Sequence, residues 1–281
     1  MGRKKIPRYI FDDQADPQAR VERTLRIIDC EEAVRALPEV LQEAYDRKLS
    51  HLDFINLLLD PVMHKREAER VERWQKQARF PWLKTLESYN FKHPDFIDEA
   101  KVKRLAQCDW IDNGANVIFF GPSGVGKTHL SIALGLEAIN RGYETRFVTV
   151  DRLTEMISVA MGKDKNQGGG ENRKKLLSGF ANVKLLILDE LAYSKIDQEV
   201  SDFLFHLICR RYDLNTSTIF TSNEGLMEWD KFFLNNKARA MAAIDRILRD
   251  CVDVNIRGKS FRSAGLQLSN YRKPGRGASA K

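Results

Sequence analysis

The order of hydrophobic and polar residues divides the chain into two parts. In the first, over residues 21–79, apolar residues recur near the three- and four-residue spacing of amphipathic helices. Residues with this spacing include Leu25, Ile28, Leu37, Leu41 and Ala44. We expect a small all-helical N-terminal domain here, serving DNA binding or self-assembly, after a polar, flexible arm over residues 1–20.

Local signals suggest where these helices begin and end. Ser50 and Asp53 have the spacing of a capping box ahead of an apolar stretch, and Pro61 is expected to punctuate the chain after it. The charged segment 64–79 is expected to be a further helix. The sequence Phe-Pro-Trp after it breaks that helix and opens a linker over residues 80–96.

From residue 97 to 262, short apolar runs alternate with amphipathic segments. Strands are expected at Val117–Phe120, Thr145–Val150, Val183–Leu188, Ser217–Thr221 and Val252–Ile256. Helices are expected at Glu99–Asp109, Thr128–Asn140, Arg152–Met161 with Asp151 as its cap, Arg173–Phe180, Gln198–Tyr212, Leu226–Phe233 and Ala238–Arg249. Strands alternating with helices predict an α/β fold in which a parallel sheet is covered by helices on both faces. The segment 162–172 is expected to be a mobile loop.

Composition supports a globular protein that needs no disulfide or metal for stability. The 281 residues include 43% hydrophobic and 30% charged residues, which excludes collagen-like, mucin-like and wholly disordered chains. No apolar run approaches the roughly 18 residues of a transmembrane helix, and the N-terminus has no signal-peptide pattern. The four cysteines and five histidines show no zinc-site spacing. We expect reduced thiols, no membrane association and a cytoplasmic location.

The positive charge is concentrated at the C-terminus. Residues 254–281 contain no acidic residue, and their seven basic residues equal the whole net charge of +7. These are Arg257, Lys259, Arg262, Arg272, Lys273, Arg276 and Lys281. A basic, flexible tail over residues 263–281 favours a polyanion such as nucleic acid as partner; a solvated tail that only maintains solubility is the alternative.

A glycine-rich motif follows the first expected strand. The residues from Gly121 to Thr128 fit the pattern GxxxxGK[ST], in which backbone N–H groups surround phosphate oxygens at a helix N-terminus. The residues expected to bind the nucleotide are Gly121, Pro122, Ser123, Gly124, Val125, Gly126, Lys127, Thr128 and His129. Lys127 is expected to bridge the β- and γ-phosphates, and Thr128 to bind Mg²⁺. ATP and Mg²⁺ are therefore the expected cofactors.

Polar residues end two later strands. Asp189 ends a strongly apolar strand and offers a carboxylate to Mg²⁺, while the adjacent Glu190 could activate an attacking water. Asn223 follows another buried strand and could contact the γ-phosphate or orient water; capping a turn is its alternative role. Together with the phosphate-binding loop, two adjacent acids favour an ATPase.

These motifs resemble the AAA+ ATPases. The resemblance rests on GPSGVGKTHL (121–130), LLILDEL (185–191), TSN (221–223) and Asp245-Arg246. Among AAA+ proteins, the chain resembles the IstB-like transposase helpers, which are related to DnaC-type helicase loaders. The more specific stretches are ARFPWLKTLESYNF (78–91), RGYETRFVT (141–149), IDQEVSDFLFHLICRRY (196–212) and NIRGKSFR (255–262). Ala192 and Lys195 stand where that family more often has Gly and Pro.

The resemblance implies ATP-dependent assembly of a homo-oligomer, as a ring or spiral, on duplex DNA in the bacterial nucleoid. It also implies a transposase partner. By similarity, Arg246 is the candidate arginine finger that completes a neighbouring subunit's site, and Arg262 is a weaker candidate for sensing the nucleotide in its own subunit.

Candidate DNA contacts are basic residues in one segment of the chain. The basic residues Lys163, Lys165, Arg173, Lys174 and Lys175 surround the expected mobile loop and are candidate phosphate contacts; a surface insertion without a DNA role is the alternative. The leading hypothesis is an ATP-hydrolysing regulator of DNA transposition that recruits or activates a transposase. The alternatives are a DnaC-like loader of a replicative helicase and a nucleotide-gated architectural DNA-binding protein whose hydrolysis is incidental.

Overall fold

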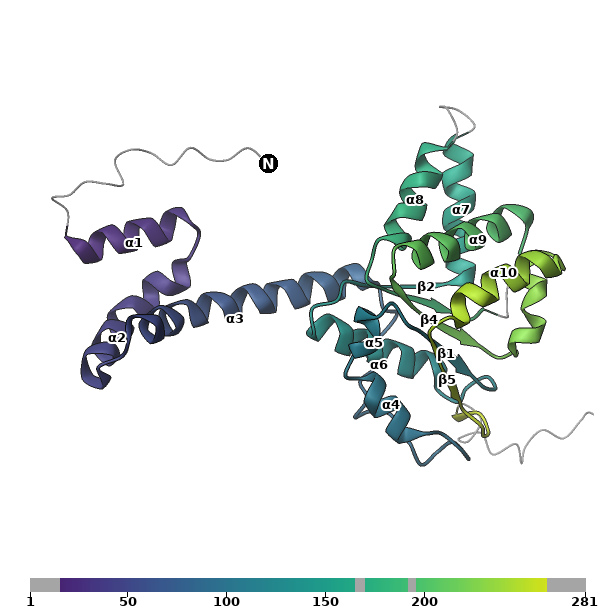
Figure 1. The fold of residues 1–281 in the computed structure, drawn as a ribbon, viewed down its shortest axis with the longest axis horizontal. Helices are drawn as coiled ribbons and strands as arrows, with labels where there is room; N and C mark the ends of the chain where they lie inside the picture. Colours follow the sequence, from purple (N-terminus) through teal and green to yellow (C-terminus); the bar gives the residue numbers. More distant parts are fainter. Residues whose placement is uncertain (1–15, 165–169, 192–195, 262–281) are drawn as a thin grey trace, which may run out of the picture. The chain divides into compact units, whose positions relative to one another are not determined.

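The computed structural model describes residues 16–164, 170–191 and 196–261 (Figure 1). The chain divides into two compact units, residues 1–73 and 74–281, which are described separately. Within the described ranges, no helix combines the length and apolar character that a membrane crossing requires.

The first unit is helical. It contains α1 (Pro17–Ile27), α2 (Glu31–Arg47) and most of α3 (His51–Ala78). Its small core is formed by Leu25, Cys30, Ala33, Val34, Leu37, Val40, Leu58 and Val62. The predicted cap at Ser50 is confirmed, because its hydroxyl accepts a hydrogen bond from the Asp53 N–H at 3.2 Å.

Two boundaries of this unit differ from the prediction. α1 begins at Pro17, so the last four residues of the expected arm are helical; the Asp16 side chain caps the helix and proline is favoured in a first turn. α3 continues through Pro61, where an interruption was expected. A proline removes one helical hydrogen bond, and burial of Leu58 and Val62 on either side offsets that loss.

The second unit is built on a five-stranded sheet. The strands are β1 (Asn116–Phe120), β2 (Thr145–Thr149), β3 (Leu185–Asp189), β4 (Ser217–Ser222) and β5 (Cys251–Asn255). Their order is β2-β3-β4-β1-β5, and every neighbouring pair is parallel. The carboxyl ends of all five strands therefore lie at the same edge.

Helices cover both faces of this sheet (Figure 1). They are α4 (Glu99–Leu105), α5 (Asp109–Asp112), α6 (Lys127–Asn140), α7 (Val150–Asp164), α8 (Glu171–Ala181), α9 (Gln198–Asp213), the 3₁₀ helix η2 (Leu226–Phe233) and α10 (Lys237–Leu248). The predicted fold class, an α/β fold with a parallel sheet covered by helices on both faces and preceded by a helical region, is confirmed.

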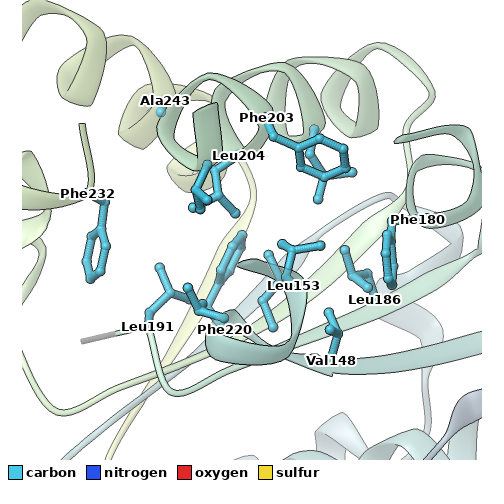
Figure 2. Close-up of a cluster of buried hydrophobic side chains, with 14 of the residues drawn as sticks. Val148, Leu153, Phe180, Leu186, Leu191, Phe203, Leu204, Phe220, Phe232 and Ala243 are labelled. Carbon is cyan, nitrogen blue, oxygen red and sulfur yellow. The ribbon is translucent and has the colours of Figure 1, made fainter. Parts of the chain in front are cut away.

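A separate hydrophobic cluster lies on each face. Figure 2 shows the cluster in which β2, β3 and β4 pack against α7 to α10, with Val148, Leu186 and Phe220 supplied by the strands. The other cluster joins the sheet to α4, α5, α6 and the segment before them. In β1, Ile118 belongs to the first cluster while Val117 and Phe119 belong to the second, as strand alternation requires.

Two local predictions in this unit were wrong. The expected helix Glu99–Asp109 ends at Leu105, and a second short helix, α5, begins at Asp109, because Cys108 has a left-handed backbone with φ of 64°. α7 begins at Val150, and the Thr149 hydroxyl accepts from the Arg152 N–H at 3.2 Å, so Thr149 takes the capping role expected of Asp151. Both a hydroxyl and a carboxylate can cap a helix. Because β2 ends at Thr149 and α7 begins at the next residue, the Thr149 hydroxyl is the group that reaches the first turn of α7.

The buried Arg211 joins three segments of the second unit. Its guanidinium donates to the carbonyls of Phe180, Ala181, Val183 and Ser217 and to the Thr218 hydroxyl. Burial lowers its pKa to about 9. The side chain thus donates to carbonyls where α8 ends and where β4 begins, and links both segments to α9.

We expect Arg211→Met to destabilise the second unit by about 3 kcal/mol or more, because several buried carbonyls lose their donors. Urea unfolding followed by circular dichroism measures the change. The exposed neighbour provides the matched control, Arg210→Met, which should change stability by less than about 0.5 kcal/mol. Equal unfolding midpoints for the two variants would contradict this role.

Candidate nucleotide-binding site

The loop between β1 and α6 has the backbone geometry of a phosphate-binding loop. Gly124 and Gly126 have φ of 81° and 98°, which side chains other than hydrogen rarely permit. A Cβ at Gly126 would lie 2.5 Å from Tyr89, and one at Gly124 would lie 2.0 Å from the Ser260 hydroxyl. Both glycines are therefore required by conformation and by close neighbours.

Lys127 is buried at the first turn of α6. Its ammonium donates to the Gly121 carbonyl at 2.7 Å, to the Pro122 carbonyl at 2.8 Å and to the Asn223 side-chain oxygen. Two predicted site residues that are 96 positions apart in the sequence are thus in direct contact. The charge is held at the end of the sheet where a phosphate would bind.

Asp189 is the centre of a network of hydroxyl groups. Its carboxylate accepts from Thr128 at 2.9 and 3.0 Å and from Thr221 at 2.6 Å. Burial raises its pKa above the ordinary value, while these two hydrogen bonds and the charge of Lys127 oppose the shift. The two residues predicted to bind Mg²⁺, Thr128 and Asp189, therefore lie side by side.

Glu190 follows directly at the end of β3. Its φ of 59° lies in the left-handed region, which is uncommon for a residue with a side chain and costs conformational energy. The Glu190 N–H donates to the Thr221 hydroxyl at 2.9 Å. This contact holds the strained turn and directs the Glu190 side chain to the cavity described next.

A cavity of about 360 Å³ connects the predicted residues. Its lining includes Ser123, Gly124, Val125, Gly126, Lys127, Thr128, His129, Glu190 and Asn223. This volume falls in the range of small-molecule sites. The phosphate-binding loop and the polar ends of β3 and β4 thus belong to one site.

The remaining walls were missed by the sequence analysis. They come from the segment 80–96 and from the chain after β5, and they are Trp82, Lys84, Ser88, Tyr89, Asn90, His93 and Phe261, with Thr221 from β4. The Tyr89 hydroxyl donates to the Val125 carbonyl at 2.9 Å, and burial raises its pKa to about 12. Aromatic residues are concentrated in residues 80–93, and this was the sequence signal from which the additional wall could have been predicted.

His129 connects this wall to α6. Its Nε2 lies 2.8 Å from the Thr85 carbonyl and 3.2 Å from the Ser88 hydroxyl, and burial lowers the pKa of the ring. The ring also packs edge-on against Tyr89. Although His129 lines the cavity, its ring nitrogen is engaged by the linker.

The donor set fits ATP with Mg²⁺. Glycines of the loop leave the backbone open at the α6 N-terminus, where anions are favoured, and Lys127 adds a fixed positive charge. The Thr128 hydroxyl and the Asp189 carboxylate are oxygen ligands of the kind that Mg²⁺ prefers.

The proposed arginine finger lies elsewhere. Arg246, in α10, lines a small cavity with Gly114, Asn116, Tyr212 and Thr216 at the amino ends of β1 and β4. The nucleotide cavity lies at the carboxyl ends of the same strands. The length of β1 therefore separates Arg246 from the phosphate-binding loop of its own chain, a distance on the order of 15 Å.

The candidate DNA contacts are also outside the cavity. Arg173, Lys174 and Lys175 lie on α8, and Lys175 pairs with Glu171 at 2.7 Å. Lys163 is in the last turn of α7, while Lys165 and Arg262 lie outside the described residues. Four positions of the predicted set are therefore placed on α7 and α8, away from the nucleotide.

The solved structures to which this chain is similar include a DnaI and a DnaC helicase loader. A crystal structure of DnaI covers 66% of this chain and 92% of its own, with 21% identity and a TM-score of 0.49. A DnaC helicase loader covers 66% and 99%, with 21% identity and a TM-score of 0.48.

Relatives with higher identity are proteins of insertion sequences. An "Insertion sequence IS21 putative ATP-binding protein" of Pseudomonas aeruginosa is 36% identical over 224 residues, covering 79% of this chain and 81% of its own length. The corresponding IS5376 protein of Geobacillus stearothermophilus is 33% identical over 219 residues, covering 78% and 84%. The family model "IstB-like ATP binding protein" matches residues 24–268. Glu190 lines one cavity with the phosphate-binding loop, Asp189 is hydrogen-bonded to Thr128 of that loop, and the family model and the relatives agree with this site: the chain belongs to the IstB-like ATP-binding proteins of insertion sequences.

Proposed function

We propose that this protein is an ATP-hydrolysing regulator of DNA transposition. ATP joins its subunits into a homo-oligomer on target DNA, the assembly recruits or activates a transposase, and hydrolysis resets it. The observation that carries the proposal is the position of Arg246 at the sheet edge opposite its own nucleotide site. Such an arginine can complete only the site of another subunit.

The chemistry assigned to each residue follows from its place. The loop N–H groups and Lys127 bind and orient the phosphates of ATP. Mg²⁺, when held by Thr128 and Asp189, would neutralise negative charge on the phosphate oxygens. Asn223, already in contact with Lys127, orients the terminal phosphate or the attacking water.

Glu190 is the candidate base. It lines the cavity beside Thr221 and Asn223, and its backbone is fixed by the hydrogen bond to the Thr221 hydroxyl. A carboxylate in that place can orient a water and accept its proton as the water attacks the γ-phosphate.

An arginine that acts on the nucleotide of a neighbouring subunit would couple ATP binding to assembly of the oligomer. Arg246 is held in α10 by a hydrogen bond from its guanidinium to the Ala242 carbonyl and by the Tyr212 ring 5.8 Å away. A guanidinium placed on the γ-phosphate of a neighbouring subunit would link subunits only while that phosphate is present. ATP binding then favours the oligomer and hydrolysis releases it.

The proposed DNA and transposase interactions are supported by the relatives of this chain and by its positively charged residues. The relatives are insertion-sequence proteins, and a mobile element encodes a machinery that acts on DNA. Arg173 and Lys174 on α8 and the basic C-terminal residues supply cations for phosphate contacts. Binding to the transposase rather than to a hexameric helicase, tested by pull-down with each, separates this function from that of a helicase loader.

Glu190→Gln should lower ATP hydrolysis by about 10²–10⁴-fold, because the amide cannot accept the proton. ATP-bound oligomers should accumulate on duplex DNA, as measured by size-exclusion light scattering. The exposed Glu199 provides the matched control, Glu199→Gln, which should behave as the unmodified protein. Normal turnover by Glu190→Gln would exclude Glu190 as the base.

Thr221→Val should lower hydrolysis by about 10–100-fold while ATP affinity stays within a few fold, because Asp189 and Glu190 lose a shared positioning hydroxyl. Single-turnover hydrolysis and titration with a fluorescent ATP analogue measure the two effects. Thr154→Val removes a hydroxyl bonded only within α7 and serves as control. An equal loss in affinity and turnover would argue against positioning.

Arg246→Ala and Lys127→Ala should each reduce hydrolysis by about 10³-fold or more. An equimolar mixture should recover part of the activity, because an intact pocket of one variant meets an intact arginine of the other. Mixing Lys127→Ala with the double variant Lys127→Ala/Arg246→Ala is the control without recovery. Absence of recovery in the first mixture would contradict the trans assignment.

A further inference from the structure

β2 forms a free edge of the sheet. It stands first in the strand order and pairs only with β3, from Thr145 opposite Leu185 to Thr149 opposite Asp189. Among the described residues, no backbone hydrogen bond joins Arg146, Phe147 or Val148 to any segment other than β3. The outer edge thus offers backbone N–H and C=O groups to another strand.

A groove within the second unit follows this edge. Its cavity of about 560 Å³ is lined by Lys76, Gln77, Ala78, Arg79, Pro81, Arg146, Phe147, Val148, Thr149, Arg152, Met156 and Phe180. It shares no lining residue with the nucleotide cavity. Four consecutive residues of β2 form one wall, so the groove is parallel to the free edge.

The groove is cationic over an apolar floor. Lys76, Arg79, Arg146 and Arg152 are among its lining residues, whereas none of the lining residues is acidic. Phe147, Val148 and Phe180 are more than nine-tenths buried and give the floor its apolar character.

Two of the cations can accept a new anionic partner. The Nε of Arg146 is buried and has no hydrogen-bond partner among the described residues, so an acceptor placed there would satisfy it. Arg152 pairs with Glu155 at 2.6 Å, but both side chains are more than 60% exposed, which makes this pair weak and exchangeable.

We propose that this groove binds an acidic, extended peptide segment of a partner protein, which adds to the sheet as a strand beside β2. Backbone hydrogen bonds to the free edge provide affinity, and carboxylates facing Arg146 and Arg152 provide selectivity. Five residues of β2 correspond to about 16 Å, so the contact spans about five peptide residues.

The backbone favours a peptide over a nucleic acid. The free edge of a strand presents donors and acceptors in alternation, and a peptide strand matches both. A phosphodiester backbone supplies acceptors only and would leave the β2 carbonyls unpaired. Side chains of a peptide strand also alternate between the two faces of the sheet, so they would meet Phe147 on one face and Phe180 on the other.

A designed peptide tests the proposal with the full-length protein. The probe is a fluorescein-labelled decapeptide of alternating Val and Glu, measured by fluorescence anisotropy. A second peptide has the same sequence with N-methyl groups on alternate amides, which keeps the charge but prevents strand pairing. We expect the first to bind at least tenfold more tightly, and to slow amide hydrogen exchange at Arg146–Val148.

Two charge-reversing variants locate the contact. Arg146→Glu and the more exposed Arg152→Glu should each weaken binding of the first peptide at least tenfold, with unchanged circular dichroism and ATP affinity. Lys103→Glu, at an exposed position of α4, is the matched control and should leave binding unchanged. Arg152→Glu keeps the test valid if Arg146→Glu fails to fold.

Three results would overturn the proposal. The first is no binding of the alternating peptide at 1 mM, a concentration at which even weak strand addition is detected. The second is equal binding of the N-methylated peptide, which would show charge attraction alone. The third is loss of single-stranded oligonucleotide binding in both variants while peptide binding is unchanged, which would make the groove a nucleic-acid site. Because ATP affinity is measured in parallel, failure here is distinguishable from failure of the proposed ATPase function.

Discussion

The hydrogen bonds that converge on the Asp189 carboxylate connect the three segments on which the nucleotide site depends. Thr128 from α6 and Thr221 from β4 both donate to this carboxylate at the end of β3. The carboxylate is buried, which raises its pKa and disfavours its charge, and these donors offset part of that effect. Removing the carboxylate would take the shared acceptor from both hydroxyls, and removing either hydroxyl would take one donor from the buried carboxylate.

This convergence is possible because β4 pairs in parallel with β3 on one side and with β1 on the other. In a parallel sheet the carboxyl ends meet at one edge, and loops that follow those ends can share a ligand. The two hydrophobic clusters hold the strands in register from both faces. Packing of the core therefore fixes the positions of the polar groups at the edge.

The sheet offers different edges for different interactions. The carboxyl edge contains the nucleotide cavity, and the amino edge carries Arg246. The side edge at β2 is unpaired and borders the cationic groove. Because Arg246 is separated from the cavity of its own chain, the proposed mechanism needs a second subunit. The groove beside β2 shares no residue with the nucleotide cavity, so the proposed peptide partner could bind independently of the nucleotide.

The sequence by itself determined the class of fold and the set of residues expected to bind ATP. Alternating apolar runs and helical periods predict the parallel sheet, and the motif ending in Lys127 and Thr128 needs glycines at fixed spacing for local backbone reasons. Local sequence signals predicted helix boundaries and caps less well where tertiary packing favours a different one. α3 continues through Pro61, and Thr149 caps α7 in place of Asp151.

Only the tertiary structure decided which distant residues complete the site. Thr221, Tyr89 and Phe261 line the cavity, and their roles come from contacts with Asp189, Val125 and Gly124 that are distant in the sequence. The same is true of Arg211 in α9, whose buried acceptors belong to two other segments, the end of α8 with the residues after it and the start of β4. Backbone conformation and periodicity are local properties that a sequence pattern records, whereas the order of strands in the sheet sets which side chains meet.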